Sequence, residues 1–478
     1  MSEGQAVRRW FHLDGLWRHP DFIKIWTAAT VSLFGTSISQ IAIPVIAVLV
    51  LHAKPFEFAL IETISFLPWL LFTLPAGVWV DRLPRRRILI SSDLARAAML
   101  ITIPIASALN VLTIYQLYVV GFLNGVLTVF FDVADQSYLP TVVERDQLIE
   151  GNSKLQLSSS SAQLLGQPAG GAVVALITAP FAVILDAFSY VASAFLILGI
   201  KRQEPRVKTG TLGEKGPGMR AEIAEGLRYI LSNPMLSKIA ACTGSSNLFS
   251  NISFAVLPLY ILEDLQMSVP QYGALGGFLG AGVLLGALVA DRISRWFGVG
   301  RTILGAVALG GPAGLLIPFA PRDLAFPLFA TSFFLSGVSN VVYNVNQISL
   351  RQAITPERML GRLNGTMRFL VWGTIPIGSV IGGILAQFLG VHNGILIGAV
   401  LGLFPFVPVL FSPVPALKTI PESDRSEPSD QAYVGGEDAG SEAARLPAAA
   451  PADAGLGMDP SLEGELTAEA EGDQRRGT

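Results

Sequence analysis

Two stretches of this chain repeat each other about 212 residues apart. The repeat is marked by small residues: Gly166, Gly170 and Gly171 correspond to Gly378, Gly382 and Gly383, and Asn152 corresponds to Asn364. Both copies lie in apolar, glycine-rich sequence. Substrate sites of many membrane transporters lie between two such repeats. The duplication therefore points toward a transporter built from two related membrane halves.

The composition fits a chain that crosses a membrane. Hydrophobic residues make up 51% of the sequence and charged residues 14%, against about 25% charged in an ordinary soluble domain. A soluble protein this apolar would expose large aggregation-prone patches. Here the apolar residues form blocks long enough to span a bilayer, for which about 20 residues suffice.

These blocks predict an all-α membrane protein with twelve transmembrane helices in two pseudo-symmetric halves of six. The expected helices are 22–51, 56–80, 88–109, 113–134, 155–177, 180–200, 236–262, 270–290, 302–320, 324–344, 364–389 and 394–411. The corresponding domains are an N-terminal segment (1–21), a first half (22–200), a central linker (201–235), a second half (236–412) and a C-terminal tail (413–478). A short helix is expected within the linker, over 219–231, and such a helix could lie on the membrane surface. The alternative is a flexible tether with one or two helical turns.

The distribution of charge predicts the orientation. Residues 422–478 carry a net charge of −10, so that the rest of the chain carries +7. Lys and Arg gather in the linker and in the connections after even-numbered helices, whereas the odd-numbered connections hold little beyond Lys54 and Arg322. The positive-inside rule then places both termini and the linker in the cytoplasm. The acidic tail lacks apolar periodicity, which is typical of disorder.

Several classes of function are disfavoured. Cys242 is the single cysteine and the four histidines are scattered, so no metal site is expected. The chain has no P-loop lysine motif, nucleophile elbow or HExxH motif. We therefore expect no catalytic residues, no cofactor and no nucleic-acid partner. We also expect the protein to act as a monomer, with the bilayer and a small-molecule substrate as its partners.

A motif after the second expected helix carries a family resemblance. The stretch 77–87 reads Gly-Val-Trp-Val-Asp-Arg-Leu-Pro-Arg-Arg-Arg, and a degraded copy occurs at 286–292. This pattern resembles the signature of the major facilitator superfamily. Segments 26–40, 131–140 and 150–154 are similar to bacterial drug and siderophore exporters of the enterobactin-exporter and macrolide-efflux type. The resemblance implies proton-driven export across the bacterial cytoplasmic membrane.

The resemblance also implies a gating latch on the cytoplasmic side. In that family the Asp of the motif faces the start of the eleventh helix, near 361–365 here, where a helix N-terminus favours a carboxylate. The alternative is ordinary cytoplasmic positive charge without a gating role. The residues assigned to the latch are Gly77, Asp81, Arg82, Arg86, Asp93 and Asp132.

Ionisable residues inside apolar blocks are candidates for proton coupling. Glu62 in the second helix and Asp186 in the sixth lie about two turns from the expected outer face. Either could carry the coupling proton. The alternatives are that Asp186 makes a structural hydrogen bond and that Glu62 faces outer water.

Amides and a phenol in otherwise apolar helices suggest the lining of a central cavity, although many of them would be plain interhelical hydrogen bonds. A second group of small residues and one proline favours close packing of helices. Gln167 and Pro168 depart from the antiporter signature of drug exporters, which leaves helix packing and an antiporter role as open alternatives. The cavity candidates are Gln40, Asn124, Gln163, Asn247, Asn251, Asn340 and Tyr343, and the packing motif comprises Gly166, Pro168, Gly170, Gly171, Gly378, Gly382 and Gly383.

The expected function is secondary active transport, with export of an apolar or amphipathic small molecule such as a drug, macrolide or siderophore. A flippase for a lysolipid or lipid precursor is one alternative. A non-transporting membrane sensor that signals through the tail is another.

Overall fold

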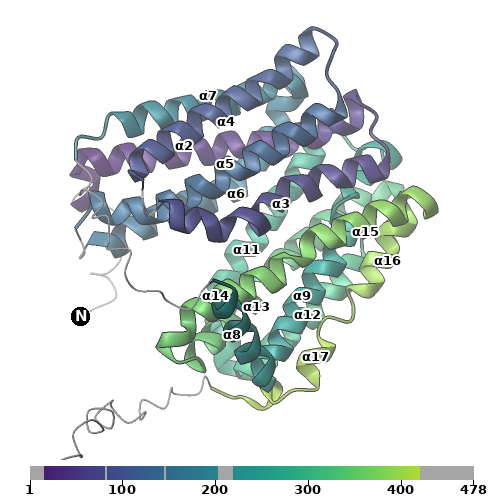
Figure 1. Ribbon diagram of the computed structural model, residues 1–478. Coiled ribbons are helices and arrows are strands. Elements are labelled where there is room, and N and C mark those ends of the chain that lie inside the picture. The colour runs from purple at the N-terminus through teal and green to yellow at the C-terminus, as the bar shows by residue number, and fades with distance from the viewer. Residues whose placement is uncertain (1–14, 81–82, 145–146, 203–218, 420–478) are drawn as a thin grey trace, which may run out of the picture. The chain divides into compact units, whose positions relative to one another are not determined.

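The computed structural model describes residues 15–80, 83–144, 147–202 and 219–419. Within these ranges the secondary structure is helical and no strand occurs (Figure 1). The helices fall into two related sets of six, which confirms the expected all-α fold.

The first half begins at a short 3-10 turn, η1 (Gly15–Arg18). Helix α2 packs against α6 and α7, α3 packs against α5, and α4 packs against α5 and α7. The helices are α2 (Pro20–Val45) with its π-helical extension η2 (Ile46–Val50), α3 (Pro55–Val80), α4 (Arg85–Ala108), α5 (Ile114–Val142), α6 (Leu148–Ile177) and α7 (Ala179–Leu198).

The second half repeats this packing. Helix α9 packs against α15 and α16, α11 against α13, and α12 against α13 and α16. The helices are α9 (Pro234–Phe254), α10 (Leu257–Leu259) with η4 (Tyr260–Asp264), α11 (Val269–Phe297), α12 (Val299–Leu315), η5 (Arg322–Leu324), α13 (Ala325–Ala353), α14 (Glu357–Trp372), α15 (Thr374–Leu389), α16 (Val391–Leu401), α17 (Val407–Leu410) and η6 (Val414–Ala416).

The duplication extends to unusual backbone conformations. The first helix of each half ends in a π-helical turn, η2 or η4. Each turn is followed by a residue with positive φ, His52 (48°) in the first half and Gln266 (52°) in the second. Thr178 (68°) and Gly390 (89°) likewise precede the last helix of each half. Because non-glycine residues rarely adopt positive φ, these matching conformations mark two copies of one backbone.

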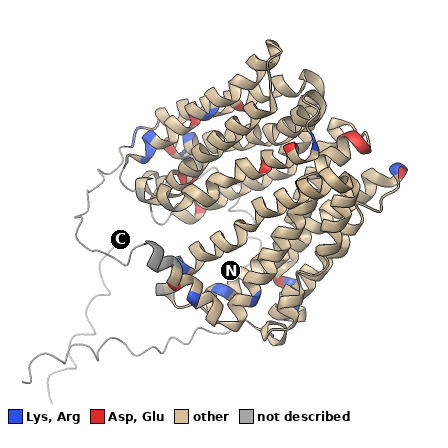
Figure 2. Cartoon of the chain, turned by 45° about the vertical axis from the view of Figure 1, so that its right-hand side comes forward, with Lys and Arg blue, Asp and Glu red and all other residues tan. Residues whose placement is uncertain are grey.

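Length and composition mark nine of the described helical segments as able to cross a membrane. The three remaining members of the two sets are α6, which contains the serine run 158–161, and the shorter helices α12 and α16. The order of the helices therefore supports the expected twelve spans, whereas length and hydropathy support nine of them. Figure 2 shows long uncharged stretches in the helices of both halves.

Several expected helices differ from the structure. The fifth, expected over 155–177, begins at Leu148, and the seventh, expected over 236–262, is divided into α9, α10 and η4. The eleventh, expected over 364–389, is divided at Gly373 into α14 and α15. The linker contains α8 (Met219–Ser232), close to the expected 219–231. Helix α8 packs against α14. Arg362 forms a 2.8 Å ion pair with Glu225, and the absence of a side chain at Gly226 allows close approach to α14.

The two halves meet through two pairs of crossing helices, α6 with α11 and α3 with α15. We call the end of the bundle that holds η2 and η4 the far end, and the end that holds α8 the linker end. At the far end one apolar core includes buried residues of both halves, such as Ile46, Ala59 and Ile261. At the linker end a Cβ atom added at Gly77, Gly361 or Gly365 would meet nothing within 4 Å. The halves are thus closed together at the far end and more open toward the linker end.

Candidate functional site

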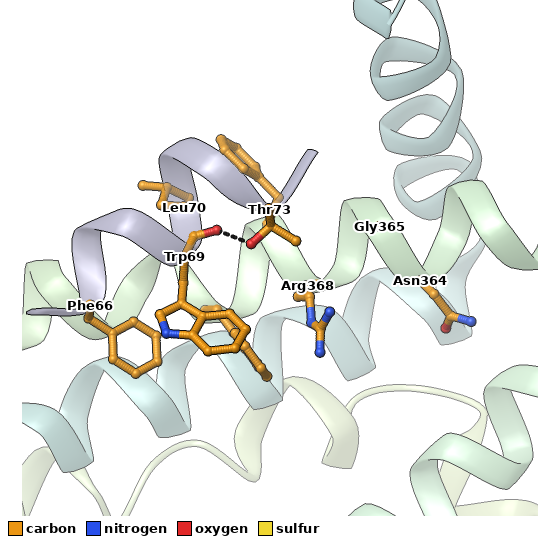
Figure 3. A pocket seen from close by; sticks show the side chains of 9 residues that line it. Phe66, Trp69, Leu70, Thr73, Asn364, Gly365 and Arg368 are labelled. Carbon is orange, nitrogen blue, oxygen red and sulfur yellow. Dashed lines mark hydrogen bonds between the residues drawn. The ribbon is translucent and has the colours of Figure 1, made fainter. Parts of the chain in front are cut away.

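A cavity of about 200 Å³ lies between α3 of the first half and α14 of the second. It sits between the middle of these helices and the linker end. Figure 3 shows Trp69 and Arg368 turned toward the same space. The lining consists of Phe66, Trp69, Leu70, Thr73, Asn364, Gly365, Arg368, Phe369 and Trp372. We call this cavity the aromatic pocket.

The aromatic pocket combines one cation with a cluster of rings. The ring centroids of Trp69 and Trp372 are 5.7 Å apart at an interplanar angle of 68°, and those of Phe66 and Trp372 are 6.1 Å apart at 65°. Cζ of Arg368 lies 4.5 Å from the Trp372 ring centroid. Edge-to-face ring pairs and cation–π contacts each contribute about 0.5–1.5 kcal/mol. The rings therefore hold the guanidinium in a defined position.

A larger cavity of about 390 Å³ lies mainly within the second half. No Asp, Glu, Lys or Arg lines it in the part of the chain that the structure describes. Four of the expected cavity residues do line it: Gln163, Asn247, Asn340 and Tyr343. We call this space the uncharged cavity. Its hydroxyls and amides among apolar walls are typical of small-molecule sites.

Two of these lining residues also hold helices together. The side-chain amide of Asn247 donates a 3.1 Å hydrogen bond to the Val371 carbonyl, which links α9 to α14. The hydroxyls of Tyr343 and Thr243 are 2.6 Å apart and link α13 to α9. Asn247 and Tyr343 therefore both line the cavity and hold neighbouring helices together.

The other three expected cavity residues do not line either cavity. Gln40 accepts a 3.0 Å hydrogen bond from Gln167 of α6. Asn251 donates a 2.8 Å bond to the Asn247 carbonyl one turn earlier in α9. Oδ1 of Asn124 is buried without a hydrogen-bond partner among the described residues. Of these three residues, only Gln40 matches the alternative expectation of an interhelical hydrogen bond.

A cluster of charges lies inside the first half. Arg96 forms a buried ion pair with Asp93, one turn earlier in α4. The Arg96 guanidinium lies 4.2 Å from the ring centroids of both Phe131 and Tyr190. The acidic members of this cluster that interact electrostatically with Arg96 are Asp93, Asp132, Asp135 and Asp186. We call these five residues the acidic cluster.

Asp186 joins this cluster to α2. Its carboxylate accepts hydrogen bonds from Ser39 at 2.5 Å and from Ser189 at 3.2 Å. A Cβ atom at Gly35 would lie only 2.8 Å from the Asp186 carboxylate, so that glycine lets α2 approach α7 closely. Asp186 therefore has the structural hydrogen bond that the sequence left as an alternative, and it also belongs to the acidic cluster.

Glu62 lies apart from the acidic cluster, on α3 at the junction of the halves. It is partly buried and interacts with Ser379 of α15 and Tyr272 of α11, both in the second half. The structure thus does not bring the two proton-coupling candidates together. Glu62 lies on α3, in one of the two helix pairs that join the halves, whereas Asp186 is internal to the first half.

The expected latch can be placed only in part. Asp81 and Arg82 lie outside the described residues. Arg86 donates hydrogen bonds to the carbonyl oxygens of Ile197 (3.2 Å) and Leu198 at the end of α7, where a cation complements the helix C-terminus. Asp93 and Asp132 belong to the acidic cluster, and Gly77 has open space around its Cα.

The two copies of the glycine motif occupy equivalent places. In the first copy, a Cβ at Gly170 would lie 3.1 Å from the Ile38 Cα of α2, and one at Gly171 would lie 2.9 Å from the Val269 carbonyl oxygen of α11. In the second copy, Gly378 and Gly382 approach the backbone of α9, and a Cβ at Gly383 would lie 2.6 Å from Ala59 Cβ of α3. Each motif therefore packs on the first helix of its own half and on a helix of the other half. Gly166 approaches Ser37, and Pro168 lies against Gly277 of α11.

Sequence reasoning missed Arg368, Trp69 and the participation of Arg96 and Asp135 in a single cluster. A signal for Arg368 was present, because an ionisable residue inside an expected membrane helix is a functional candidate. The acidic cluster combines side chains from α4, α5 and α7. No pattern within any one of these helices predicts that they meet.

The sequence matches a family described as transmembrane secretion effectors over residues 16–435. It is 26% identical to the multidrug efflux pump Tap of Mycolicibacterium fortuitum over 78% of this chain and 91% of that protein. It is 25% identical to the enterobactin exporter EntS of Escherichia coli over 74% of this chain and 82% of that protein. Among solved structures, a bacterial homologue of the iron transporter ferroportin in its inward-facing state matches with a TM-score of 0.66 at 16% identity, over 83% of this chain and 99% of that one.

Proposed function

We propose that this chain, which belongs to the transmembrane secretion effectors of the major facilitator superfamily, is a proton-driven exporter of amphipathic small molecules in the bacterial cytoplasmic membrane. Membership makes the protein a multi-pass membrane transporter and not an enzyme. Export is supported by the activities named for the relatives, which are an efflux pump and an exporter. The proton and the substrate class are the parts that we propose.

The acidic cluster is the observation that carries proton coupling. It places four carboxylates around one arginine in the interior of the first half. If all of them were ionised, the cluster would hold three uncompensated negative charges on buried and partly buried side chains, which is costly in a low-dielectric interior. Binding and release of protons relieves this cost. A cluster of this kind can therefore couple proton movement to rearrangement of the helices that contribute it.

Asp132 is the member best placed to report on the transport cycle. It is partly exposed, whereas Asp93 is fully buried against Arg96. Asp132 also interacts electrostatically with Arg368 of the second half. A proton on Asp132 would change the attraction between the two halves. Asp186 within the cluster and Glu62 at the α3–α15 junction are the two further candidates.

The two cavities support an amphipathic substrate. The uncharged cavity offers amides and hydroxyls among apolar walls, and the aromatic pocket offers ring faces. The aromatic pocket lies between the middle of the bundle and the linker end, and the uncharged cavity lies between the middle of the second half and the far end. With the positive-inside rule, the linker end is the cytoplasmic end, so that substrate would enter from the cytoplasm and leave at the far end. We also propose that the latch residues hold the halves together at the cytoplasmic end and that the protein acts as a monomer.

The test is transport by purified protein in proteoliposomes, measured in two modes for the variants Asp132→Asn, Asp186→Asn and Glu62→Gln. One mode is accumulation of a fluorescent amphipathic drug against its gradient, driven by an imposed pH difference. The other is downhill equilibration of the same drug without a pH difference. A coupling residue is needed only for the first mode. We expect Asp132→Asn to abolish accumulation while downhill movement persists.

The control is Asp291→Asn. Asp291 is exposed at the end of α11 and pairs with the exposed Arg295 at 2.8 Å, where a surface pair is worth about 0–1 kcal/mol. This variant should keep both modes. Accumulation that survives in all three test variants would refute proton coupling through these carboxylates. Loss of both modes in a test variant would assign its carboxylate a structural role.

A further inference from the structure

We infer that the aromatic pocket binds an organic anion with a planar aromatic body, held by Arg368 and by the rings of Trp69 and Trp372. This inference rests on the proposed function and adds a substrate class to it. It assigns a binding role to a side chain that neither the family motif nor the duplicated glycines include.

The first argument concerns the charge of Arg368. Its side chain is exposed to the pocket, and within the described part of the chain no carboxylate lies within 4.0 Å of it. Arg96, in contrast, is paired with Asp93, and Arg362 is paired with Glu225. A guanidinium without a counter-ion, in a pocket with mostly apolar walls, favours an incoming anion.

The second argument concerns the shape of the recognition groups. The guanidinium is a planar fork that binds carboxylate, sulfonate or phosphate oxygens through two parallel hydrogen bonds. Its contact with the Trp372 ring restricts its position. Asn364 lies farther along the same pocket (Figure 3). Its Oδ1 accepts a 3.2 Å hydrogen bond from Arg351, which leaves the Nδ2 amide as a donor for the same anion.

The third argument concerns the body of the ligand. Phe66, Trp69 and Trp372 supply three neighbouring rings next to the cation. Aromatic ligands gain from stacked and edge-to-face contacts with such rings, beyond the burial of apolar area. An aromatic anion would therefore satisfy the cation and the ring cluster together. A flexible aliphatic anion would pair with the Arg368 guanidinium but make no ring contacts. An aromatic cation would contact the rings but be repelled by the guanidinium.

A competing role for Arg368 is attraction to Asp132 across the two halves. In that case Arg368 would affect closure of the linker end and not the choice of ligand. The two roles differ in what they predict for charge selectivity. Removal of a closure contact would alter the binding of all ligands to a similar extent, whereas removal of an anion-binding group would weaken the binding of anions alone.

The test is a binding titration of the full chain in nanodiscs, with empty nanodiscs subtracted. Two probes share one ring system and differ in charge: 1-pyrenesulfonate and 1-pyrenemethylammonium. Energy transfer from the seven tryptophans of the chain to pyrene reports binding. We expect the wild type to prefer the sulfonate. Arg368→Gln should raise the Kd of the sulfonate about tenfold or more, as expected for a lost charge-assisted hydrogen-bond pair, and leave the Kd of the ammonium probe unchanged.

Three further variants make the result specific. Arg368→Lys keeps the charge without the fork and should recover part of the sulfonate affinity. Trp69→Leu should weaken binding of both probes to a similar extent, because they share the ring system. Arg301→Gln, which removes an exposed arginine at the start of α12, should change neither Kd.

Equal Kd values for both probes in the wild type would overturn the inference, and so would an unchanged sulfonate Kd in Arg368→Gln. Equal weakening of both probes in Arg368→Gln would also overturn it, in favour of the closure role. These titrations contain no pH gradient. Their result therefore tests anion binding independently of proton coupling. Conversely, gradient-driven export of neutral or cationic drugs would uphold the proposed function even if anion binding failed.

Discussion

Replacement of Gly171 by alanine should shift the protein away from the conformation described. The added Cβ would lie 2.9 Å from the Val269 carbonyl oxygen and 3.0 Å from the Gly273 Cα, both backbone atoms of α11. Neither atom can rotate away, so one helix must move. Such overpacking costs about 1–3 kcal/mol, and Ala in place of Gly within a helix returns about 0.5–1 kcal/mol. The net cost is on the order of 1 kcal/mol.

This cost falls on a contact at the far end, where the halves are closed together. A conformation that opens the far end separates α6 from the start of α11 and escapes the cost. A net 1 kcal/mol corresponds to about a fivefold change in the equilibrium between the two conformations. The linker end should consequently be open for a smaller fraction of the time.

A reporter cysteine at Gly365 measures this fraction. A side chain at Gly365 meets nothing within 4 Å and borders the aromatic pocket, whereas the native Cys242 is buried. Reaction of Gly365→Cys with a polar maleimide should slow by up to about fivefold when Gly171→Ala is added. Gly305→Ala, where an added Cβ also meets nothing within 4 Å, is the matched control and should leave the rate unchanged. A lower melting temperature with an unchanged labelling rate would refute the argument, because the cost would then be equal in both conformations.

Two further predictions concern the acidic cluster and the orientation. Arg96→Gln leaves Asp93 buried without its partner, and should destabilise the protein by about 3–5 kcal/mol, measured by thermal unfolding; a loss below about 1 kcal/mol would contradict a tightly paired cluster. In right-side-out membrane vesicles, an impermeant maleimide should label Asp323→Cys at the far end and not Ser232→Cys at the linker end, and the opposite pattern would refute a cytoplasmic linker.

The sequence predicted features that repeat or that depend on a single helix. The two halves followed from the 212-residue repeat, and the position of α8 followed from a local amphipathic pattern. The spacing of Asp93 and Arg96 by one helical turn could also be recognised from the chain. These features depend on periodicity, which a single sequence records directly.

Other features arise only when helices pack. The division of α14 from α15 at Gly373 lies within a continuous apolar block, which hydropathy treats as one helix. Asp186 lies far in sequence from Asp93 and Asp132, and only the contacts of α7 with α4 bring it near them. The aromatic pocket combines Trp69 and Arg368 from different halves. Proximity of this kind is a property of the tertiary structure and leaves no trace in local composition.

The acidic cluster lies wholly within one copy of the duplicated unit, while the uncharged cavity is built almost entirely from the other copy. Duplication gave both copies the same backbone, and the side chains then specialised. One consequence is modularity under selection. If the uncharged cavity binds substrate as proposed, substitutions in its walls would change the range of exported compounds and leave the acidic cluster intact. A lineage exposed to new toxic compounds could adapt through the walls of the uncharged cavity, and we expect substitutions selected by directed evolution to gather there.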